Sequence, residues 1–532
     1  MSENYPVLTA TALKAAIAAG AELAILDARE EGQFGQKHLF FASCVPYGRI
    51  ETLIDRLVPR RSARIVVTDG AGEIAPRAAA KLAGLGYGNV SVLEGGTAAW
   101  ERAGFEVYSG VHVPSKAFGE AVHAAWHPPE ISSAELHSRL GQPEKLVVID
   151  SRPFEEYQNR SIPGAIDCPG AELIYRIGEL VPDPETSIVI NCGGRTRGII
   201  GAQTLIATGV PNRVRVLDGG LQEWILSGYE PRHGASGYAP QPSPENLAVA
   251  QARARRLAEA TRVTRIDSER LAWFEAEREN RTLYKLDIRG PEEYAAGHLP
   301  DWRHAPGGQL LQATDTYIGV RNSRIVLADW DGVRALTTAA WLIQLGGYEV
   351  FVYAPDASSP LETGPERIRV LRSAPNAAPW IEPGSLQALL QAGTAVVFDV
   401  DNSLEYRKQH IPGAYFTSPE RAGEFVAKLG EGGVVVITSA DGILAQSVAS
   451  SLQGNGRDIR ALLGGNRNWR RFGLPVESGI ERRLTGEEDV YYGPWAYDGE
   501  EGLARKRRYL DWEIGLTQQA QRDEENRFKL AF

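Results

Sequence analysis

One pattern of residues occurs four times along this chain, and it limits the possible folds more than any other feature. Each copy starts with an apolar strand that ends in an aspartate, which we place at 24–29, 147–152, 284–289 and 396–401. An acidic segment with an aromatic residue and a turn come next, and then a second apolar strand at 65–68, 188–191, 325–328 and 434–438. Three copies close with a Gly-Gly turn and a tryptophan, at 95–100, 219–224 and 464–469. Such repetition predicts tandem copies of one structural unit.

Apolar strands that alternate with helical patterns are typical of parallel sheets covered by helices on both faces. The predicted fold class is therefore α/β, with four doubly wound parallel-sheet domains and a C-terminal helical tail, and each repeat has the size of a small domain. The predicted domains are 1–108, 129–233, 263–365 and 378–480. The other predicted segments are an inter-domain stretch at 109–128, a linker and helix at 234–262, and the tail at 481–532.

The segments outside the repeats differ in composition. Residues 108–120 are too apolar for a free linker, whereas the Gly-, Pro- and Ser-rich stretch at 234–244 predicts a linker between the two halves of the molecule. The tail has a charged helical stretch from about 500 to 528 with clustered aromatic residues, which usually dock on a surface. Docking on the fourth repeat and docking on a second subunit are the two alternatives, and the sequence does not choose between them.

Composition excludes several classes of protein. A chain of 532 residues is too long for one hydrophobic core, and its 43% hydrophobic and 23% charged residues are ordinary for a globular protein. The net charge of −10 argues against nucleic acid as the main partner, and no apolar run is long enough to span a membrane. Residues 1–20 show no export signal, and the three cysteines have no metal-ligand spacing. We therefore expect a cytoplasmic protein without a metal or a cofactor.

A single cysteine follows the second strand of repeat two. The apolar run 188–191 delivers Cys192 into a loop with two glycines and two arginines, and a helical stretch at 199–207 follows directly. This order places a thiol over a helix N-terminus among backbone N–H groups, where the thiolate is favoured over the thiol. The arginines add positive charge that lowers the thiol pKa further and attracts a small anion. We therefore expect a reactive cysteine and an anionic substrate.

The aspartate at the end of the first strand and the arginine two positions later have a structural interpretation. In repeat two they are Asp150 and Arg152. The carboxylate is suited to accept backbone N–H bonds from the next loop while the arginine braces it. We expect this pair to support the site rather than to take part in the reaction.

The order of these motifs resembles that of the rhodanese family of sulfurtransferases. The chain contains the strand-Asp-x-Arg segment, an Ile-Pro-Gly-Ala turn at 162–165, the strand-cysteine loop-helix segment and the Gly-Gly-x(3)-Trp turn. Four copies cover nearly the whole chain, which is therefore similar to a tandem tetra-rhodanese. The resemblance implies a doubly wound α/β fold for each repeat and a cysteine that carries sulfane sulfur as a persulfide.

Only the second repeat has a cysteine after its second strand. The corresponding residues of the other repeats are Asp69, Asp329 and Ser439. A carboxylate cannot form a persulfide, and a serine without a general base is a poor nucleophile. These three loops also lack the arginine pair, since Arg334 is the only arginine among them. We predict that repeats one, three and four are inactive and serve packing, homodimer contacts or the shaping of the entrance to repeat two.

The other two cysteines, Cys44 and Cys168, align at equivalent places in repeats one and two, just after the turn. Two cysteines at one structural position suggest small, semi-buried residues. The alternative is a resolving thiol for Cys192, for which Cys168 is the better candidate because it lies in the same domain.

The expected chemistry is covalent sulfur transfer. The Cys192 thiolate attacks the outer sulfur of a donor such as thiosulfate, expels sulfite and becomes a persulfide, from which cyanide, a thiol or another protein takes the sulfur. Arg195 and Arg197 are expected to bind the donor and lower the thiol pKa, with bracing of the loop through Asp150 or a glutamate as the alternative. Lys116 is expected either to pack between domains or to bring a further positive charge to the mouth of the site. The remaining donor contacts are assigned to the loop residues Gly193, Gly194, Thr196 and Gly198.

Loop length separates several competing functions. Four residues lie between Cys192 and Arg197, whereas the cysteine-based phosphatases of this fold type have five, which disfavours a phosphatase or an arsenate reductase. Mercaptopyruvate sulfurtransferases typically begin this loop with Cys-Gly-Ser/Thr-Gly, and the chain departs from that pattern at Gly194 and Arg195. Thiosulfate or a small persulfide such as glutathione persulfide is therefore favoured over mercaptopyruvate. A different alternative is a persulfide carrier or sensing scaffold whose inactive repeats dock a partner enzyme.

Overall fold

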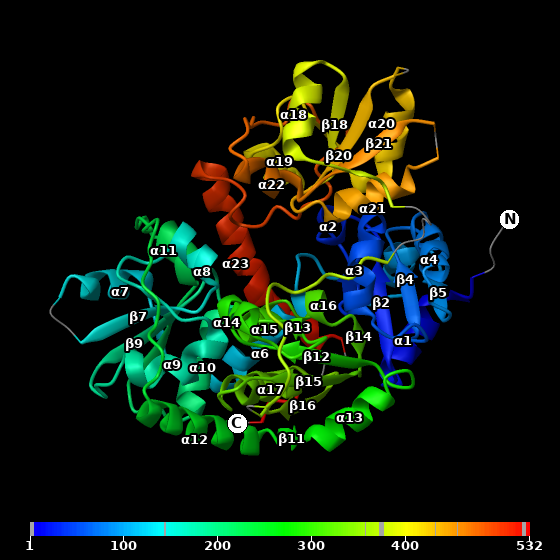
Figure 1. Cartoon of the computed structure of the whole chain (residues 1–532). Coiled ribbons are helices and arrows are strands. Elements are labelled where there is room, and N and C mark those ends of the chain that lie inside the picture. The colour runs from blue at the N-terminus through cyan, green and yellow to red at the C-terminus, as the bar shows by residue number, and fades with distance from the viewer. Residues whose placement is uncertain are drawn as a thin grey trace. The chain divides into compact units, whose positions relative to one another are not determined.

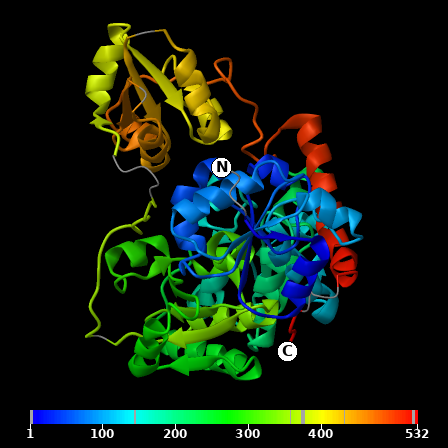
Figure 2. The same ribbon diagram turned by 90° about the vertical axis from the view of Figure 1, so that its right-hand side faces the viewer.

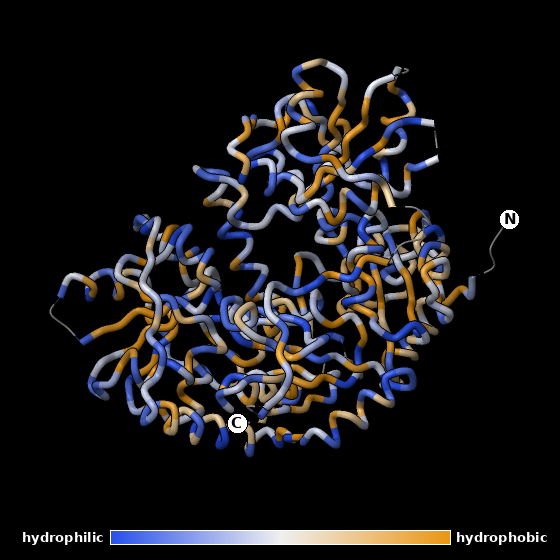
Figure 3. The backbone as a smooth tube through the Cα atoms, viewed as in Figure 1, coloured by the Kyte–Doolittle hydropathy of each residue, from blue (hydrophilic) through white to orange (hydrophobic). Residues whose placement is uncertain are grey.

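The structure, a computed structural model, describes residues 5–142, 145–356, 358–371, 377–430, 432–454, 456–523 and 528–531. Each repeat forms its own parallel β-sheet with helices packed against it, as Figures 1 and 2 show. Hydrophobic residues concentrate in the central strands, and hydrophilic residues concentrate in the outer helices and loops (Figure 3). The predicted fold class, four α/β domains followed by a C-terminal helix, is confirmed.

The five principal strands of every repeat pair in the same order. Numbered by their position within a repeat, they lie in the order 1-5-4-2-3 across the sheet, and the pairings are parallel. The strands of repeat one are β1 (Val7–Leu8), β2 (Leu23–Asp27), β3 (Ala42–Cys44), β4 (Ile65–Thr68) and β5 (Val90–Leu93). Those of repeat two are β6 (Glu130–Ile131), β7 (Leu146–Asp150), β8 (Ile166–Asp167), β9 (Ser187–Asn191) and β10 (Val214–Leu217).

Repeats three and four reproduce this arrangement. The strands of the repeat-three sheet are β11 (Thr264–Ile266), β12 (Leu283–Asp287), β13 (Arg303–His304), β15 (Arg324–Ala328) and β16 (Glu349–Tyr353). The short β14 (Val320–Arg321) lies between β13 and β15 along the chain and is not part of this sheet. Those of repeat four are β17 (Trp380–Ile381), β18 (Ala395–Asp399), β19 (Tyr415–Phe416), β20 (Val434–Thr438) and β21 (Asp458–Leu462). Strand ends therefore place the same kind of loop at the same edge of all four sheets.

Helices connect successive strands. Repeat one contains α1 (Ala10–Ala18), α2 (Glu31–Phe34), α3 (Ile50–Leu57), α4 (Ala75–Gly84) and α5 (Gly96–Arg102). Repeat two contains α7 (Ser133–Leu140), α8 (Phe154–Asn159), α9 (Leu173–Leu180), α10 (Thr196–Ala207) and α11 (Gly220–Leu226). Repeat three contains α13 (Ser268–Ala276), α14 (Pro291–Ala296), α15 (Gly307–Gln312), α16 (Thr314–Tyr317) and α17 (Arg334–Leu345). Repeat four contains α18 (Pro383–Gln391), α19 (Ser403–Lys408), α20 (Ala422–Lys428), α21 (Ile443–Ser451) and α22 (Gly465–Arg471).

Three longer helices lie outside the repeats: α6 (Val113–Trp126), α12 (Pro244–Ala260) and α23 (Gly499–Gln521). Short 3₁₀ turns precede the helix after the third strand in repeats one, two and four, at Tyr47–Arg49, Gly170–Glu172 and Pro419–Arg421. No helix within the described ranges combines the length and the apolar character needed to cross a membrane.

The Gly-Gly-x(3)-Trp turn has a specific steric basis in repeat two. Gly219 and Gly220 both have positive φ, at 62° and 55°, which favours glycine. A Cβ on Gly220 would lie 2.6 Å from the carbonyl oxygen of Cys192, so a side chain there is excluded. Trp224 is fully buried, and its indole N–H donates to the Glu230 carbonyl at 3.1 Å. The turn thus brings α11 against the cysteine loop.

The chain forms two compact units. The first contains repeats one and four, as residues 1–15, 23–111 and 368–491. The second contains repeats two and three together with α6, α12 and α23, as residues 16–22, 112–367 and 492–532. The second unit therefore holds Cys192 and all the residues discussed with it below.

The prediction of a linker between halves at 234–244 is wrong, because both flanking repeats belong to the second unit. This stretch is held along repeat two, where Asp167 and Ala239 bond through their backbones and Arg176 donates to the Ala239 carbonyl at 2.9 Å. The helix that follows, α12, packs against α9 and α17. The glycines and prolines of residues 234–244 therefore belong to an irregular segment that packs against repeat two.

The start of the predicted tail packs on repeat four, where Asp489 accepts the Ser403 backbone N–H and Thr485 accepts that of Ser418. The tail helix lies elsewhere. Within the second unit α23 packs on α6 and α11, beside the cysteine loop of repeat two. Phe528 also contacts Phe118 of α6, with ring centroids 5.3 Å apart. The aromatic residues that indicated docking therefore lie on a helix packed beside repeat two, a place that the composition of the tail alone does not reveal.

Candidate active site

Cys192 lies where β9 ends and just before α10 begins. The last residue of β9, Asn191, pairs in register with Asp150 at the end of β7. The chain then turns so that the backbone N–H groups of Gly194 and Gly198 are directed at Cys192 Sγ. The sulfur therefore sits at the N-terminus of a 12-residue helix, where unpaired N–H groups stabilise negative charge.

The same backbone N–H faces the strand-end side chain in all four repeats. In repeat two this is the N–H of Gly198, directed at Cys192. In the other repeats the N–H six positions after the strand-end residue donates to its side chain, from Ala75 to Asp69 (2.8 Å), Ala335 to Asp329 (2.7 Å) and Ala445 to Ser439 (3.1 Å). In these three loops an aspartate or serine oxygen accepts this N–H, whereas in repeat two the N–H faces the cysteine sulfur.

Burial dominates the electrostatics of Cys192. The side chain is 2% exposed, and burial raises the pKa of its thiol above the ordinary value. The charge of Arg197 and the nearby N–H groups lower the pKa without offsetting burial, while the charge of Glu513 raises it further. The predicted lowering of the thiol pKa is therefore wrong for the resting site. The sequence argument counted the arginines and the helix terminus but omitted the loss of water and the carboxylate from the tail.

Arg197 is the loop arginine whose charge acts on Cys192. Its guanidinium donates to both carboxylate oxygens of Glu156 at 2.8 and 2.9 Å, and to Gln309 of repeat three at 3.1 Å. One of its nitrogens lies 3.8 Å from the point that a Cβ on Gly193 would occupy. Arg197 thus borders the cysteine loop while Glu156 fixes its orientation.

Arg195 has a different environment. It donates to both oxygens of Glu120 in α6, at 2.7 and 3.2 Å, and to Asp218 at 2.9 Å. Its charge is not among the principal causes of the Cys192 pKa shift. Of the two alternatives stated for Arg195, the structure shows bracing of the loop through a glutamate.

Asp150 and Arg152 form a closed pair beneath the site. Arg152 donates its backbone N–H to Asp150 at 3.1 Å and two guanidinium N–H groups to the same carboxylate at 2.8 and 2.7 Å. Arg152 also donates to the Arg160 carbonyl at 2.6 Å. Both residues are fully buried, so the pair braces the loop between β7 and α8.

The loop glycines lie against the C-terminal tail. A Cβ on Gly194 would be 3.0 Å from Glu513 Oε2 and 3.3 Å from the Tyr509 ring, which is tighter than ordinary contact. A Cβ on Gly193 would be 3.8 Å from Trp495, an ordinary distance. The tail therefore forms one wall of the site, and Gly194 is needed for its close approach.

Thr196 and Lys116 complete this wall. The Thr196 hydroxyl donates to Glu513 Oε1 at 2.8 Å, which joins the start of α10 to α23. Lys116 is buried in α6, with its ammonium 5.1 Å from the Tyr509 ring centroid and 4.9 Å from that of Trp512. Lys116 thus packs beneath the tail helix, where its charge acts on Glu513.

Sequence reasoning missed the tail residues of the site. The aromatic cluster around Tyr509 indicated a docking helix but not its place. Glu513 is one of 67 acidic residues, and nothing in its neighbourhood along the chain marks it. Only the fold brings it to Thr196.

The sequence alignment of Cys44 with Cys168 is wrong by one position. Strand register pairs Cys44 with Asp27, and the equivalent partner of Asp150 is Asp167. Cys168 therefore corresponds to Val45, whose backbone N–H makes the matching bond to the first strand. Cys168 is fully buried and burial raises its thiol pKa well above the ordinary value, whereas Cys44 is partly exposed.

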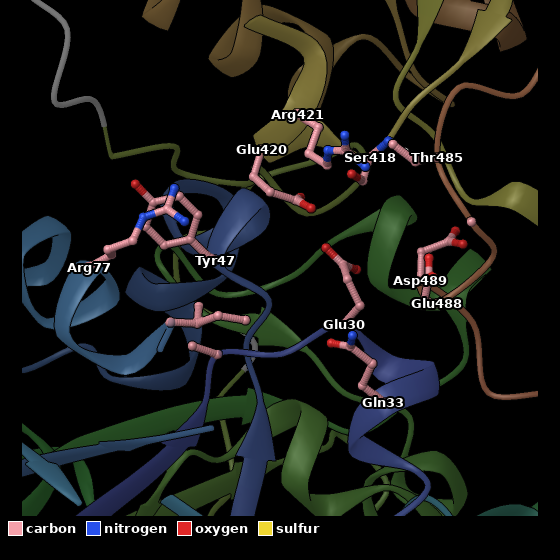
Figure 4. A pocket seen from close by; sticks show the side chains of 13 residues that line it. Glu30, Gln33, Tyr47, Arg77, Ser418, Glu420, Arg421, Thr485, Glu488 and Asp489 are labelled. Atoms are coloured by element: carbon pink, nitrogen blue, oxygen red, sulfur yellow. Dashed lines mark hydrogen bonds between the residues drawn. The ribbon is translucent and has the colours of Figure 1, made fainter. Parts of the chain in front are cut away.

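A separate cavity of about 250 Å³ lies within the first unit, between repeats one and four. Figure 4 shows Glu30 and Glu420 pointing into it, with Tyr47 and Arg77 on one side and Asp489 on the other. Burial and the nearby Glu420 charge raise the pKa of Glu30 to about 8. No cysteine lines this cavity. Among all the residues that the structure describes, no three His, Cys, Asp or Glu side chains are grouped to hold a metal ion.

Comparison with known proteins relates all four repeats to one family model. The model, described as "Rhodanese-like domain", matches residues 9–103, 132–227, 271–356 and 382–472. A crystal structure of a thiosulfate sulfurtransferase from Pseudomonas aeruginosa is 40% identical, covers 99% of this chain and 100% of its own, and superposes with a TM-score of 0.92.

Curated relatives match shorter parts of the chain. An HTH-type transcriptional regulator of Mycobacterium tuberculosis, Rv0324, is 40% identical over 105 residues, which are 20% of this chain and 45% of that protein. A 3-mercaptopyruvate sulfurtransferase of Escherichia coli (strain K12) is 28% identical over 185 residues, which are 30% of this chain and 64% of that protein. The chain thus spans less than two thirds of the length of either relative.

Proposed function

This chain belongs to the rhodanese-like family, and from that premise we propose that it moves sulfane sulfur from thiosulfate to cyanide or a thiol through a persulfide on Cys192. The observation that carries the proposal is the contrast between the four strand ends. Asp69, Asp329 and Ser439 occupy the backbone N–H groups of their own loops, whereas repeat two presents a sulfur atom to them. Repeat two is therefore the one built to stabilise a charged sulfur.

The first half of the reaction loads the cysteine. The Cys192 thiol releases its proton to solvent, and the thiolate attacks the outer sulfur of thiosulfate. A new S–S bond forms on Cys192 Sγ, the S–S bond of thiosulfate breaks, and sulfite leaves with the electron pair. Backbone N–H groups of Gly194 and Gly198 stabilise the negative sulfur without reorganising.

The second half of the reaction removes the sulfur from Cys192. The acceptor attacks the outer sulfur of the persulfide, and the Cys192 thiolate leaves with the electron pair of the S–S bond. Cyanide becomes thiocyanate, and a thiolate acceptor becomes a persulfide. The enzyme alternates between two covalent states, so the kinetics are ping-pong.

Donor binding in this proposal depends on Arg197 more than on Arg195. The charge of Arg197 acts on Cys192, whereas Arg195 is taken up by Glu120 and Asp218. An arginine held by a glutamate keeps a fixed orientation, which suits it to orient an oxyanion.

The name of the full-length structural neighbour supports thiosulfate as the donor, since that protein matches along 99% of this chain. The 3-mercaptopyruvate sulfurtransferase matches over only 30% of the chain. We therefore use mercaptopyruvate and glutathione persulfide as comparison donors in the test of this proposal.

The test is a set of turnover assays of the full chain with thiosulfate, mercaptopyruvate and glutathione persulfide, each with cyanide as acceptor. Thiosulfate is expected to give the highest kcat/KM, and mass spectrometry after thiosulfate alone is expected to show one added sulfur on Cys192. Absence of turnover with every donor, with Cys192 still loaded by a partner enzyme, would favour the persulfide carrier instead. Absence of any added sulfur on Cys192 would remove the proposal.

A further inference from the structure

Glu513 is the one acidic residue of the C-terminal helix that reaches the cysteine loop. Its side chain is 1% exposed, and its two oxygens differ. Oε1 accepts the Thr196 hydroxyl at 2.8 Å. Oε2 accepts no hydrogen bond from any residue that the structure describes, and it lies 3.0 Å from the point where a Cβ on Gly194 would be. A buried carboxylate oxygen without a donor is costly and calls for an explanation.

Three other carboxylates beside the loop have arginine partners, and of these Asp150 and Glu120 are buried while Glu156 is 40% exposed. Asp150, Glu156 and Glu120 each receive guanidinium N–H groups on both oxygens, from Arg152, Arg197 and Arg195 respectively. Asp218, the remaining neighbour, is half-exposed to solvent. Among these five carboxylates, Glu513 is the one that no arginine side chain binds.

The groups that face Glu513 come from three elements. Helix α6 contributes Lys116 and Glu120, the loop and first turn of α10 contribute Arg195 and Thr196, and α11 contributes the uncharged Gln222. Lys116 and Arg195 favour the ionised carboxylate, whereas Glu120 and, above all, burial oppose it. The Glu513 charge also acts on Cys192, whose thiol pKa it raises.

We propose that Glu513 is a specificity-determining residue that selects sulfur donors by charge. As a carboxylate beside the cysteine loop it disfavours a doubly charged donor more than a singly charged one, since the repulsion grows with the charge of the donor. As a protonated acid it removes this repulsion and offers Oε2 as a hydrogen-bond donor. The inference rests on the proposed function of Cys192 and adds the tail helix to its site.

The pH dependence follows from the direction of the shift. Burial raises the pKa of Glu513 above that of an ordinary carboxyl group, so it gains its proton at a higher pH. Below that pKa the site admits a dianion, and as the pH rises through it a dianion is increasingly disfavoured. Thiosulfate and methanethiosulfonate make a matched pair of donors, since a methyl group replaces one charged oxygen around the same sulfane sulfur.

The experiment compares kcat/KM for these two donors, with cyanide as acceptor, across a pH series in the full chain. In the wild type the ratio of thiosulfate to methanethiosulfonate is expected to fall as the pH rises. Glu513→Gln is expected to raise this ratio about threefold to tenfold at the upper end of the series, since one unit of pKa interaction is tenfold, and to remove its pH dependence. Asp511→Asn, an exposed change on the same helix, is the matched control and is expected to leave the ratio unchanged.

A second readout does not depend on sulfur transfer. Alkylation of Cys192 by iodoacetate, an anion, and by iodoacetamide, which is neutral, is expected to show the same increase in ratio for Glu513→Gln. The pH dependence of the wild-type ratio also needs no variant, so a poorly folded Glu513→Gln protein does not block the test. Ratios that are independent of pH in the wild type and unchanged in the variant would overturn the inference. Failure of thiosulfate to load Cys192, with the alkylation ratios as expected, would instead overturn the proposed function alone.

Discussion

Arg334 in repeat three occupies the position that Arg197 holds in repeat two. Each stands five residues after the strand-end side chain. Each also donates N–H groups to a glutamate of the helix that follows the second strand of its repeat, Glu293 in α14 or Glu156 in α8. Arg334 differs in that Asp331 and Glu172 also bind it. Repeat three therefore has the arginine but an aspartate in place of the cysteine.

This relationship makes Asp329→Cys the most demanding test of the inactive repeats. We expect the variant to gain no second persulfide, because three carboxylates neutralise Arg334 and leave no free positive charge for a donor. Mass spectrometry after thiosulfate treatment should show one added sulfur, on Cys192. Asp69→Cys, whose loop has Ile74 at the arginine position, is the comparison. Two added sulfurs in Asp329→Cys would show that the loop backbone and a neutralised arginine suffice.

Replacement of Cys192 should separate it from the other cysteines. Cys192→Ser is expected to abolish sulfur transfer, because the hydroxyl cannot carry sulfane sulfur. Cys168→Ser and Cys44→Ser are expected to retain most of the activity, since Cys168 is fully buried with a raised thiol pKa and Cys44 donates to the Arg29 carbonyl. Steady-state assays with thiosulfate and cyanide measure this. Turnover by Cys192→Ser at the wild-type rate would contradict the proposed mechanism.

The two loop arginines are expected to differ when each is changed to alanine. Arg197→Ala should weaken thiosulfate use by roughly tenfold to a thousandfold, from the loss of one charge-assisted contact of about 1.5–3 kcal/mol and of thiolate. It should also move the iodoacetamide labelling of Cys192 to higher pH, because the Arg197 charge lowers that thiol pKa. Arg195→Ala should mainly lower the melting temperature, because it leaves Glu120 buried and unpaired.

Equal effects of the two arginine variants on the labelling profile would contradict this division. Unchanged donor kinetics and labelling in both would make each arginine a structural brace only.

Gly194 should tolerate an added side chain less well than Gly193 does. Gly194→Ala brings a methyl group within 3.0 Å of Glu513 Oε2, so the tail or the loop must shift by a few tenths of an ångström. We expect kcat/KM to fall roughly threefold to tenfold and hydrogen exchange in α23 to increase, since small displacements at a reacting centre are costly. Gly193→Ala meets only ordinary contacts and is the matched control. Equal protection of α23 in both variants would show that the tail does not press on the loop.

The cavity of the first unit predicts a pH-dependent stability. The pKa of Glu30 is about 8 when folded, above that of an unfolded glutamate, so the folded state holds more protons between these values. Its stabilising contribution is fully present below the pKa of an unfolded glutamate, falls as the pH rises from there, and is lost above about 8. Glu30→Gln should therefore raise the melting temperature by about 2–4 °C at pH 9 and change it little at about pH 4. The exposed Glu73→Gln is the control, and equal shifts at both pH values would contradict the assignment.

The local parts of this structure were predictable from sequence. Apolar runs ending in Asp150 or Cys192, and glycine pairs such as Gly219 with Gly220, are short-range patterns whose physical causes lie within a few residues. The partners of Arg195, the carboxylate Glu513 and the burial of Cys192 were not predictable, because they depend on contacts between distant segments. The one-residue error between Cys44 and Cys168 arose because two residues of one type were matched, whereas the equivalent turn bonds, from Ala42 to Leu39 and from Ala165 to Ile162, align Cys44 with Asp167.

The hydrogen bond from Thr196 to Glu513 joins residues that are 317 positions apart. During protein synthesis, repeat two leaves the ribosome long before α23 exists, so its cysteine loop first folds without the wall that later covers it. A nascent chain, or one cut between the fourth repeat and α23, would present Cys192 with more solvent and less negative charge around it. The environment of the Cys192 thiol therefore depends on whether α23 is in place.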